Sequence, residues 1–268
     1  MKIIDHRLVH DDGRPYPYRE SPNKPDKDVE ALYLIEHYTA GASKEAAVEW
    51  LCYDGADASA HAVVGRGHDD VTQLVPFNEI AWHAGVSRWN NLVGMNKYSL
   101  GIEIDNAGRL ERHGDRWRSW FGREYDDSDV LVATHKHEQA PSGWHLYTPE
   151  QIETVAMLSR LLVKTYGLKE VLGHEDVAPG RKSDPGPAFP MHSVRARAMG
   201  RIEDGPELYK TTDWLNIRVG PGTQFEKIEL SPLEPHTQVE ILGREGRWVL
   251  VRVYDEEGWV HSYYLKRA

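Results

Sequence analysis

The sequence lacks three features, each of which would have pointed to a particular class of protein. It has one cysteine, Cys52, so an intramolecular disulfide framework is excluded and stability must come from a packed core or a metal. It has no apolar run near 18 residues, which argues against a membrane-spanning helix. Its net charge is -10 and it has no Lys/Arg cluster, so we expect no nucleic-acid partner.

A cleavable secretory signal is also not visible at the start of the sequence. The first residues, MKIIDHRL, contain no long apolar stretch followed by small residues. Release by lysis, a specialised export route and a cytoplasmic location therefore all stay open. The 268 residues, with 40% hydrophobic content, suffice for one large domain and one small one. The oligomeric state is not readable from the sequence, and we favour a monomer.

The residue pattern divides the chain into an arm and two domains. Residues 1–28 are rich in Pro and charged residues, which predicts an extended arm. Residues 29–200 mix helix and strand patterns, so we predict an α/β domain with a mixed central sheet flanked by helices. A linker is expected near 199–206. Residues 207–268 carry short strands with turn signals, which predicts a small all-β barrel.

Several elements of the first domain can be placed. The segment ALYLIEHY at 31–38 is apolar on both faces, which is typical of a buried strand. Ser43 is a suitable N-cap for a helix to Leu51, and the stretches around 60–66 and 71–75 indicate a hairpin. Residues 99–105 alternate, so that Glu103 lies opposite the face of Leu100, Ile102 and Ile104. The motif TPEQ at 148–151 predicts a capping box that opens a helix ending at Gly167.

Residues 106–147 show no sustained period and are polar and rich in Trp, His and Gly. A long irregular stretch inside a compact domain is more often functional than idle, so we interpret this one as the wall of a cleft. His135 and His137 would point to the same side of a strand, but no third possible metal ligand follows at a suitable spacing. We expect them to lie on the surface.

Two histidines and one aspartate are candidates for a metal site. A catalytic zinc needs three protein ligands and an open position for water, and His nitrogen and carboxylate oxygen both suit it. His37 ends the buried strand, His174 follows the short apolar segment 171–173, and Asp184 lies in a Pro- and Gly-rich loop that can fold back on His174.

Six stretches, in order along residues 30–190, resemble the zinc amidases of the N-acetylmuramoyl-L-alanine amidase type 2 family, to which animal peptidoglycan recognition proteins are similar. They are IEHYTA at 35–40, SAHAVV at 59–64, QLVP at 73–76, AWHAG at 81–85, SLGIEI at 99–104 and GHEDVAPGRKSDPGP at 173–187. Six ordered matches are far more specific than any single one.

The resemblance implies a role for each candidate residue. His37, His174 and Asp184 would bind Zn²⁺, Glu103 would act as catalytic acid and base, and Lys182 would stabilise the oxyanion. Taken singly, each of these residues has a plainer interpretation as a structural or surface group.

The remaining aromatic and histidine residues of these stretches are open to two interpretations. His61 and His83 are expected to be structural or to support the ligands, since three ligands are already supplied. Trp82, Trp89 and Asn91 either contact the sugar or peptide of the substrate or belong to a packed loop.

The second domain resembles a bacterial SH3-type module. The resemblance rests on LNIRVGPGT at 215–223, VEIL at 239–242, WVLVRV at 248–253 and GWVHSYYL at 258–265, and it implies a wall-targeting role, commonly through peptide cross-bridges. Residues 201–268 hold 9 basic against 12 acidic residues, so attraction to anionic wall polymers is not expected. We expect most of the aromatics in this region to form the barrel core. They are Trp214, Trp248, Trp259, Tyr263 and Tyr264.

The function predicted from these features is zinc-dependent hydrolysis of the amide bond between N-acetylmuramic acid and L-alanine, with peptidoglycan or muropeptides as partners. A non-catalytic peptidoglycan-binding protein is the first alternative, as happens in related recognition proteins that lack the zinc ligands. An amidase acting on soluble muropeptide fragments is the second. The sequence does not distinguish a wall of the same cell from that of a competitor or phage host.

Overall fold

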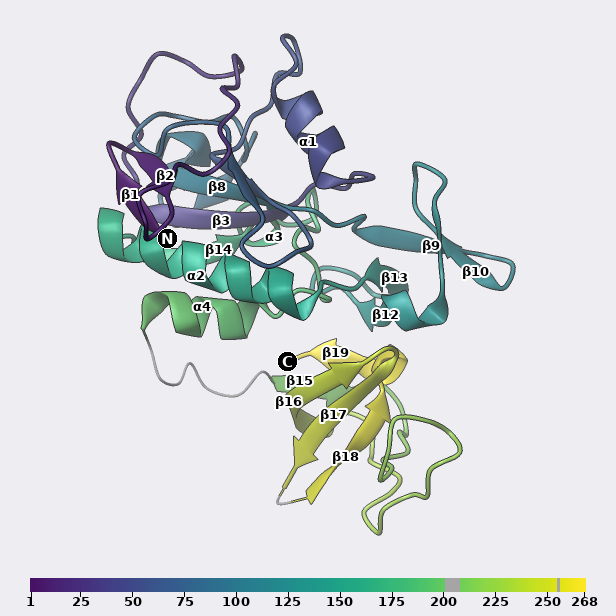
Figure 1. Cartoon of the computed structure of the whole chain (residues 1–268). Coiled ribbons are helices and arrows are strands. Elements are labelled where there is room, and N and C mark those ends of the chain that lie inside the picture. The colour runs from purple at the N-terminus through teal and green to yellow at the C-terminus, as the bar shows by residue number, and fades with distance from the viewer. Residues whose placement is uncertain (201–207, 255) are drawn as a thin grey trace. The chain divides into compact units, whose positions relative to one another are not determined.

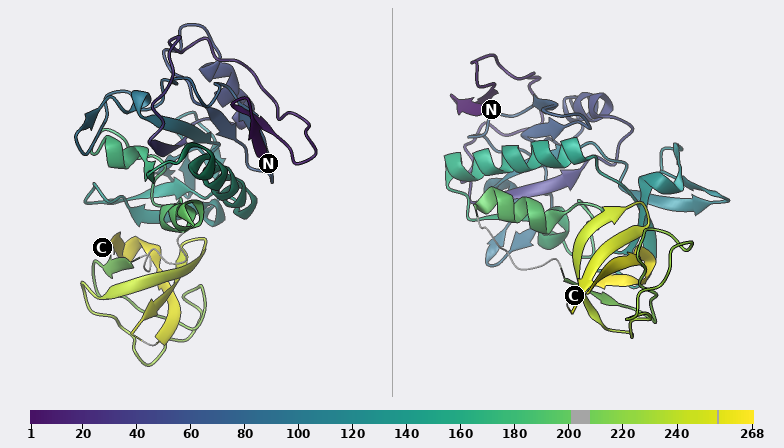
Figure 2. Two further views of the ribbon diagram at one scale, coloured as in Figure 1. Left: turned by 90° about the vertical axis from the view of Figure 1, so that its left-hand side faces the viewer. Right: turned by 60° about the horizontal axis from the view of Figure 1, so that its bottom comes forward.

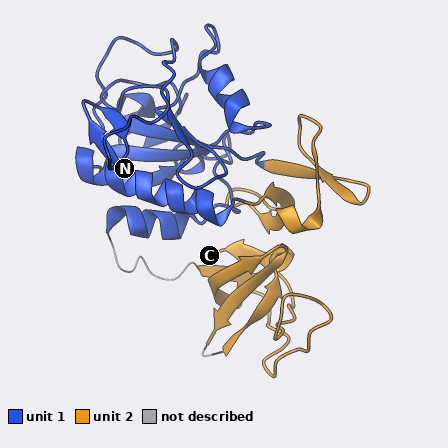
Figure 3. Cartoon of the chain, in the orientation of Figure 1, with its two compact units in different colours: residues 1–108, 147–202 blue, residues 109–146, 203–268 orange. Residues whose placement is uncertain are grey.

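The chain folds into two compact units (Figure 3) in a computed structural model that describes residues 1–200, 208–254 and 256–268. Unit 1 comprises residues 1–108 and the described part of 147–202. Unit 2 comprises residues 109–146 and the described part of 203–268. The predicted linker at 199–206 falls largely on residues outside the described ones. The segment 109–146 lies in the same unit as the C-terminal strands. The predicted domain limits, which placed this segment in the first domain, stay a prediction.

A five-stranded mixed sheet forms the centre of unit 1, in the order β14-β3-β8-β4-β5 (Figure 1). The first four strands run parallel, and β5 pairs antiparallel to β4 across the predicted hairpin. This arrangement, flanked by helices, confirms the predicted fold class. The strands are β3 (Tyr33–Tyr38), β4 (Ala62–Val64), β5 (Val71–Gln73), β8 (Ser99–Ile104) and β14 (Glu170–Gly173).

Helices cover the two faces of this sheet. Helices α2 (Pro149–Tyr166) and α4 (Met191–Met199) lie side by side along one face, and α1 (Lys44–Leu51) lies on the other (Figures 1 and 2). Strand β3 therefore alternates between two buried environments: Ser159 of α2 hydrogen-bonds Glu36, while His37 points to the opposite face. The strand is apolar on both parities because both of its faces are covered.

The predicted helix signals are confirmed with one correction. Ser43 accepts from the Ala46 N–H and caps α1, and Thr148 accepts from the Gln151 N–H and caps α2, which ends at Gly167 with φ of 65°. The second hydrogen bond of the predicted capping box, from the Thr148 N–H to the Gln151 side chain, does not form, so this part of the prediction is wrong. Gln151 is buried, its Nε2 donates to the carbonyl of Asp105 just after β8, and its Oε1 has no hydrogen-bond partner among the described residues, so it does not accept from the Thr148 N–H.

Short elements complete unit 1. The arm begins with the hairpin of β1 (Lys2–Ile4) and β2 (Arg7–Val9), and then runs extended along residues 73–80, to which several of its backbone groups hydrogen-bond. The other elements are β6 (Arg88–Trp89), β7 (Leu92–Val93), the 3₁₀ turn η1 (Met95–Lys97) and the short helix α3 (His174–Val177).

The segment 109–146 is not irregular as predicted, since it forms five short strands. They are β9 (Arg109–His113), β10 (Arg116–Arg118), β11 (Glu124–Tyr125), β12 (Val130–Thr134) and β13 (Pro141–His145), with a 3₁₀ turn η2 (Asp127–Asp129). Strands β9 and β13 pair antiparallel, as do β12 and β13. His135 is buried, so its predicted surface position is wrong.

The C-terminal part of unit 2 is the predicted all-β module. Its strands are β15 (Leu208–Thr211), β16 (Gln238–Glu245), β17 (Trp248–Val253), β18 (Glu256–His261) and β19 (Leu265–Arg267), with a 3₁₀ turn η3 (Ser262–Tyr264). The predicted aromatic core is wrong: Trp214 and Tyr263 are 59% and 45% exposed, and none of the five is fully buried. Alternating aliphatic residues such as Ile217, Val249 and Val251 fill the interior instead.

Within the described part of the chain, none of the helices has the length and apolar character required to cross a membrane.

Candidate metal centre

His37 and Glu103 occupy neighbouring positions on one face of the central sheet. Strands β3 and β8 are parallel, and their register pairs His37 directly with Glu103. Paired residues on adjacent strands point to the same face, so the imidazole and the carboxyl lie side by side. The alternation predicted for 99–105 is confirmed, since Leu100, Ile102 and Ile104 are buried on the opposite face.

His174 and Asp184 reach the same place from the other neighbour of β3. Strand β14 lies beside β3, and His174 begins α3 immediately after it. The following loop returns, and the Glu175 N–H donates to the Asp184 carbonyl at 2.9 Å. The loop therefore folds back as expected and places the carboxylate beside the imidazole.

The three predicted ligands converge on one point. The Nδ1 atoms of His37 and His174 lie 2.9 Å apart, and Asp184 Oδ2 lies 3.0 Å from the first and 2.9 Å from the second. All three side chains are buried. Two imidazole nitrogens and one carboxylate oxygen at this spacing can hold a metal ion, and this donor set is among those that zinc accepts.

The electrostatics of the centre favour a cation. Burial, together with the neighbouring His174, lowers the pKa of His37 to about 4, so its imidazole is neutral and able to ligate at pH 7. The centre therefore places the neutral His37 imidazole beside the Asp184 carboxylate.

Glu103 is a partly buried residue whose carboxyl group has spare hydrogen-bonding capacity. Its Oε2 is shielded from solvent and has no hydrogen-bond partner among the described residues. Burial raises the pKa of Glu103 well above its ordinary value, nearby Asp184 adds to this, and Lys182 opposes it. A shielded carboxylate oxygen without a partner is costly, and such groups concentrate at sites of chemistry.

The other predicted site residues differ in their surroundings. Lys182 is exposed, and its charge acts on the pKa of both His37 and Glu103, so it lies within electrostatic reach of the centre. Trp82 is 37% exposed and Asn91 is exposed, whereas Trp89 is partly buried against the cluster of Tyr33, Ile35 and Met95. Their roles toward a substrate stay predictions.

The match to a family model comes from the same region of the chain. The model for N-acetylmuramoyl-L-alanine amidase matches residues 27–187, which is more than half of the chain and includes all five residues of the predicted metal and catalytic set. The chain belongs to the N-acetylmuramoyl-L-alanine amidase family. This confirms the family predicted from the six ordered stretches.

Curated amidases are similar to this family member over part of their length. The N-acetylmuramoyl-L-alanine amidase AmiD of Escherichia coli K12 is 33% identical over 141 residues, which cover 52% of this chain and 42% of AmiD. The 1,6-anhydro-N-acetylmuramyl-L-alanine amidase AmpD of the same strain is 32% identical over 133 residues, which cover 49% of this chain and 53% of AmpD. The chain thus spans about half the length of these relatives.

A solved structure supports the fold of this amidase family member. The selenomethionine form of AmpD aligns with a TM-score of 0.51 and 24% sequence identity, covering 76% of this chain and all of that one. At this identity the likeness concerns the fold alone.

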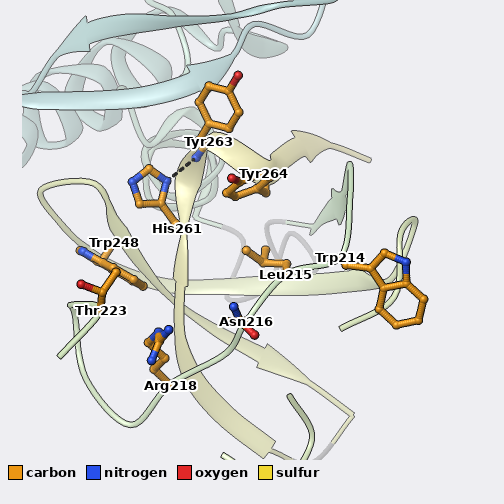
Figure 4. A pocket seen from close by; sticks show the side chains of 9 residues that line it. All are labelled: Trp214, Leu215, Asn216, Arg218, Thr223, Trp248, His261, Tyr263 and Tyr264. Carbon is orange, nitrogen blue, oxygen red and sulfur yellow. Dashed lines mark hydrogen bonds between the residues drawn. The ribbon is translucent and has the colours of Figure 1, made fainter. Parts of the chain in front are cut away.

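A second family match covers the C-terminal module of this amidase family member. The model for a bacterial SH3 domain matches residues 213–266, which confirms the predicted SH3-type module. Its surface carries a pocket of about 550 Å³, drawn in Figure 4. The side chains that line it are those of Trp214, Leu215, Asn216, Arg218, Thr223, Trp248, His261, Tyr263 and Tyr264.

Four of the five aromatic residues predicted for the barrel core line this pocket instead. Trp214, Trp248, Tyr263 and Tyr264 surround this pocket and do not fill the barrel. The lining holds one cation, Arg218, and no carboxylate, although the module as a whole is acidic. A concave site with several aromatic faces and few polar groups suits a small organic or peptide ligand.

Proposed function

We propose that this chain hydrolyses the amide bond between N-acetylmuramic acid and L-alanine, with Zn²⁺ held by His37, His174 and Asp184. The observation that carries the proposal is the convergence of these three buried donor atoms within 3.0 Å, beside Glu103, whose Oε2 is shielded from solvent and has no hydrogen-bond partner among the described residues. A structural zinc site takes four protein ligands, whereas three with an open position are typical of catalysis.

Each residue then has a chemical task. Zinc, when bound, polarises the amide carbonyl and lowers the pKa of a coordinated water toward about 7. Glu103 takes the proton of the attacking water and returns it to the L-alanine nitrogen, because an amine leaves only when protonated. Its raised pKa suits a group that must hold this proton between the two events. The Lys182 ammonium offsets the negative charge that develops on the tetrahedral oxygen.

Glu103→Gln separates this role from a structural one. We expect the variant to bind zinc as the wild type does and to lose at least about 100-fold in turnover, since amide oxygen cannot transfer the proton. Chelator competition measures the metal, and product release from a defined muropeptide measures turnover. Equal loss of metal and turnover would instead make Glu103 a structural residue.

Soluble muropeptide fragments are a second candidate substrate. The observation that favours them is the similarity to AmpD, a protein whose name specifies a 1,6-anhydro-N-acetylmuramyl substrate. Digestion of intact sacculi and of soluble anhydro-muropeptides in parallel decides between the two. We propose that the pocket of the bacterial SH3-type module holds the enzyme on peptidoglycan. If it does, intact wall is the favoured substrate.

A further inference from the structure

One dipeptide, His83-Ala84, contacts both candidate histidine ligands on the side away from the metal position. His83 Nδ1 lies 2.9 Å from His37 Nε2, and the Ala84 carbonyl oxygen lies 3.1 Å from His174 Nε2. Neither residue contributes a donor atom to the centre itself. The question is where each imidazole carries its proton, because only the unprotonated nitrogen can bind a metal.

The hydrogen bond between His83 and Ser99 determines which nitrogen of His37 carries the proton. His83 Nε2 lies 3.2 Å from the Ser99 carbonyl oxygen, which can only accept. The Ser99 hydroxyl, 3.4 Å from the same nitrogen, donates its hydrogen to the Met95 carbonyl at 2.7 Å, so His83 carries its proton on Nε2. Its Nδ1 is then an acceptor, and it receives the Nε2–H of His37. The remaining nitrogen of His37, Nδ1, is left without a proton.

The Ala84 carbonyl does the same for His174 directly. A carbonyl oxygen at 3.1 Å from Nε2 requires the proton to sit there, which leaves Nδ1 of His174 free. Arg181 Nη2 lies 2.9 Å from this carbonyl and 3.4 Å from Nε2, so its shorter bond goes to the carbonyl and His174 keeps its proton. Both free Nδ1 atoms face Asp184.

The dipeptide itself is held in place by Asn96 and by space left at Gly101. Asn96 Oδ1 accepts both backbone N–H groups of the dipeptide, at 3.1 Å from His83 and 2.6 Å from Ala84. A Cβ at Gly101 would lie 2.3 Å from the His83 ring, so only glycine leaves room for that ring against β8. These contacts hold the backbone and the ring of His83 in the position in which Nδ1 faces His37 Nε2.

We propose that His83 is a positioning residue and that the 83–84 dipeptide, clamped by Asn96, keeps both ligand imidazoles protonated on Nε2. The inference rests on the metal centre of the proposed function. Without the acceptor on His83, the Asp184 carboxylate attracts the His37 proton to Nδ1, the atom that must bind the metal. Metal binding would then have to displace that proton.

Zinc affinity of the full chain, measured by chelator competition, tests the proposal. We expect His83→Phe, which keeps a ring but removes the acceptor, to weaken zinc binding about 10–100-fold. His83→Asn places an acceptor oxygen close to the former Nδ1 position and should recover most of the affinity. His61→Phe is the matched control, because His61 is also a buried histidine but its ring nitrogens hydrogen-bond backbone groups of Glu79 and Gly101 and not a candidate ligand.

A second measurement needs neither zinc nor substrate. Imidazole ¹⁵N spectra of the metal-free chain should place the His37 proton on Nε2 in the wild type and in His83→Asn, and move it toward Nδ1 in His83→Phe. A wild-type proton on Nδ1 would overturn the proposal even if His83→Phe fails to fold. So would a folded His83→Phe that binds zinc as tightly as the wild type.

The outcome is separable from that of the proposed function. A wild-type chain that binds zinc and carries the His37 proton on Nε2, yet leaves every muropeptide intact, would contradict the amidase activity and leave the role of His83 standing.

Discussion

His37, His61 and His83 are three buried imidazoles of one sheet face, and their hydrogen-bond partners give them different tasks. His37 presents Nδ1 to the candidate metal centre, and His83 Nδ1 hydrogen-bonds the opposite ring nitrogen, Nε2. His61 donates from Nε2 to the Glu79 carbonyl and accepts the Gly101 N–H at Nδ1, so both its nitrogens are satisfied by the backbone. At the scale of the residue, burial is common to all three and the partner decides the function.

The pH dependence of stability should reveal His61. Burial lowers its pKa to about 4 from 6.5, so between these values the unfolded chain binds a proton that the native chain does not. Stability is therefore full above pH 6.5 and falls as the pH drops toward 4. Between pH 7.5 and 5 we expect the wild type to lose about 2 kcal/mol more than His61→Phe.

Urea unfolding at the two pH values, with chelator present so that metal release does not contribute, measures this difference. His61→Phe should also be less stable at pH 7.5, because it leaves two buried backbone groups unpaired. Parallel pH profiles for the two proteins would contradict a neutral, buried His61.

Sequence patterns sufficed for the candidate ligands but not for their support. His37, His174 and Asp184 stand out because each lies in a motif with metal-binding residue types, at the end of a buried strand or in a turn. The contacts of Ala84 with His174 and Arg181 use a backbone carbonyl and span 90 and 97 residues. A backbone carbonyl carries no residue-type signal, so only the folded chain reveals its role.

At the scale of the element, α2 depends on a cap that also ties it to the sheet. Thr148 Oγ1 accepts the Gln151 N–H at 3.1 Å and donates to the Arg66 carbonyl at 2.6 Å. We expect Thr148→Ala to reduce the free energy of unfolding by about 1–2 kcal/mol, since one helix N–H and one carbonyl lose their partner.

Thr148→Ser keeps the hydroxyl and serves as the control, with stability close to the wild type in urea unfolding. Zinc affinity should be unchanged in both variants, because the cap makes no contact with the metal centre. A Thr148→Ala chain as stable as the wild type would show that the cap contributes nothing beyond the packing of α2.

Element prediction succeeded where apolar periodicity was strong and failed where it was weak. The strand at 31–38 and the helix after Thr148 carry long apolar patterns with clear ends. Strands β9 to β13 have two to five residues, and those of β9 and β10 leave most of their side chains exposed. Such short strands exist because they pair with one another, and pairing between distant segments leaves little local signal.

At the scale of the whole molecule, the chain has a candidate metal centre in unit 1 and a pocket lined by aromatic residues in unit 2. The aromatic residues of the C-terminal module were expected in its core because aromatics usually bury, but four of them line the pocket. The aliphatic strands fill the small barrel without them, which leaves the aromatics available for a ligand.

Wall binding and hydrolysis should therefore be separable. We expect Trp214→Ala combined with Tyr263→Ala to weaken sedimentation with purified sacculi about tenfold or more, since exposed aromatic anchors dominate binding energy. Hydrolysis of a soluble muropeptide should not change. Trp50→Ala, at a tryptophan 58% exposed on α1, is the control and should leave wall binding intact. Unaltered sedimentation of the double variant would rule out the pocket as the wall-binding site.

The most direct test of the central claim is mass spectrometry of the products that the zinc-loaded chain releases from a panel of defined muropeptides. We expect a peptide that begins with L-alanine and a sugar that keeps its lactyl carboxylate, with product formation stopped by chelator and restored by zinc. A metal-replete, folded chain that leaves every muropeptide of the panel intact would contradict the assignment of His37, His174 and Asp184 to a hydrolytic centre.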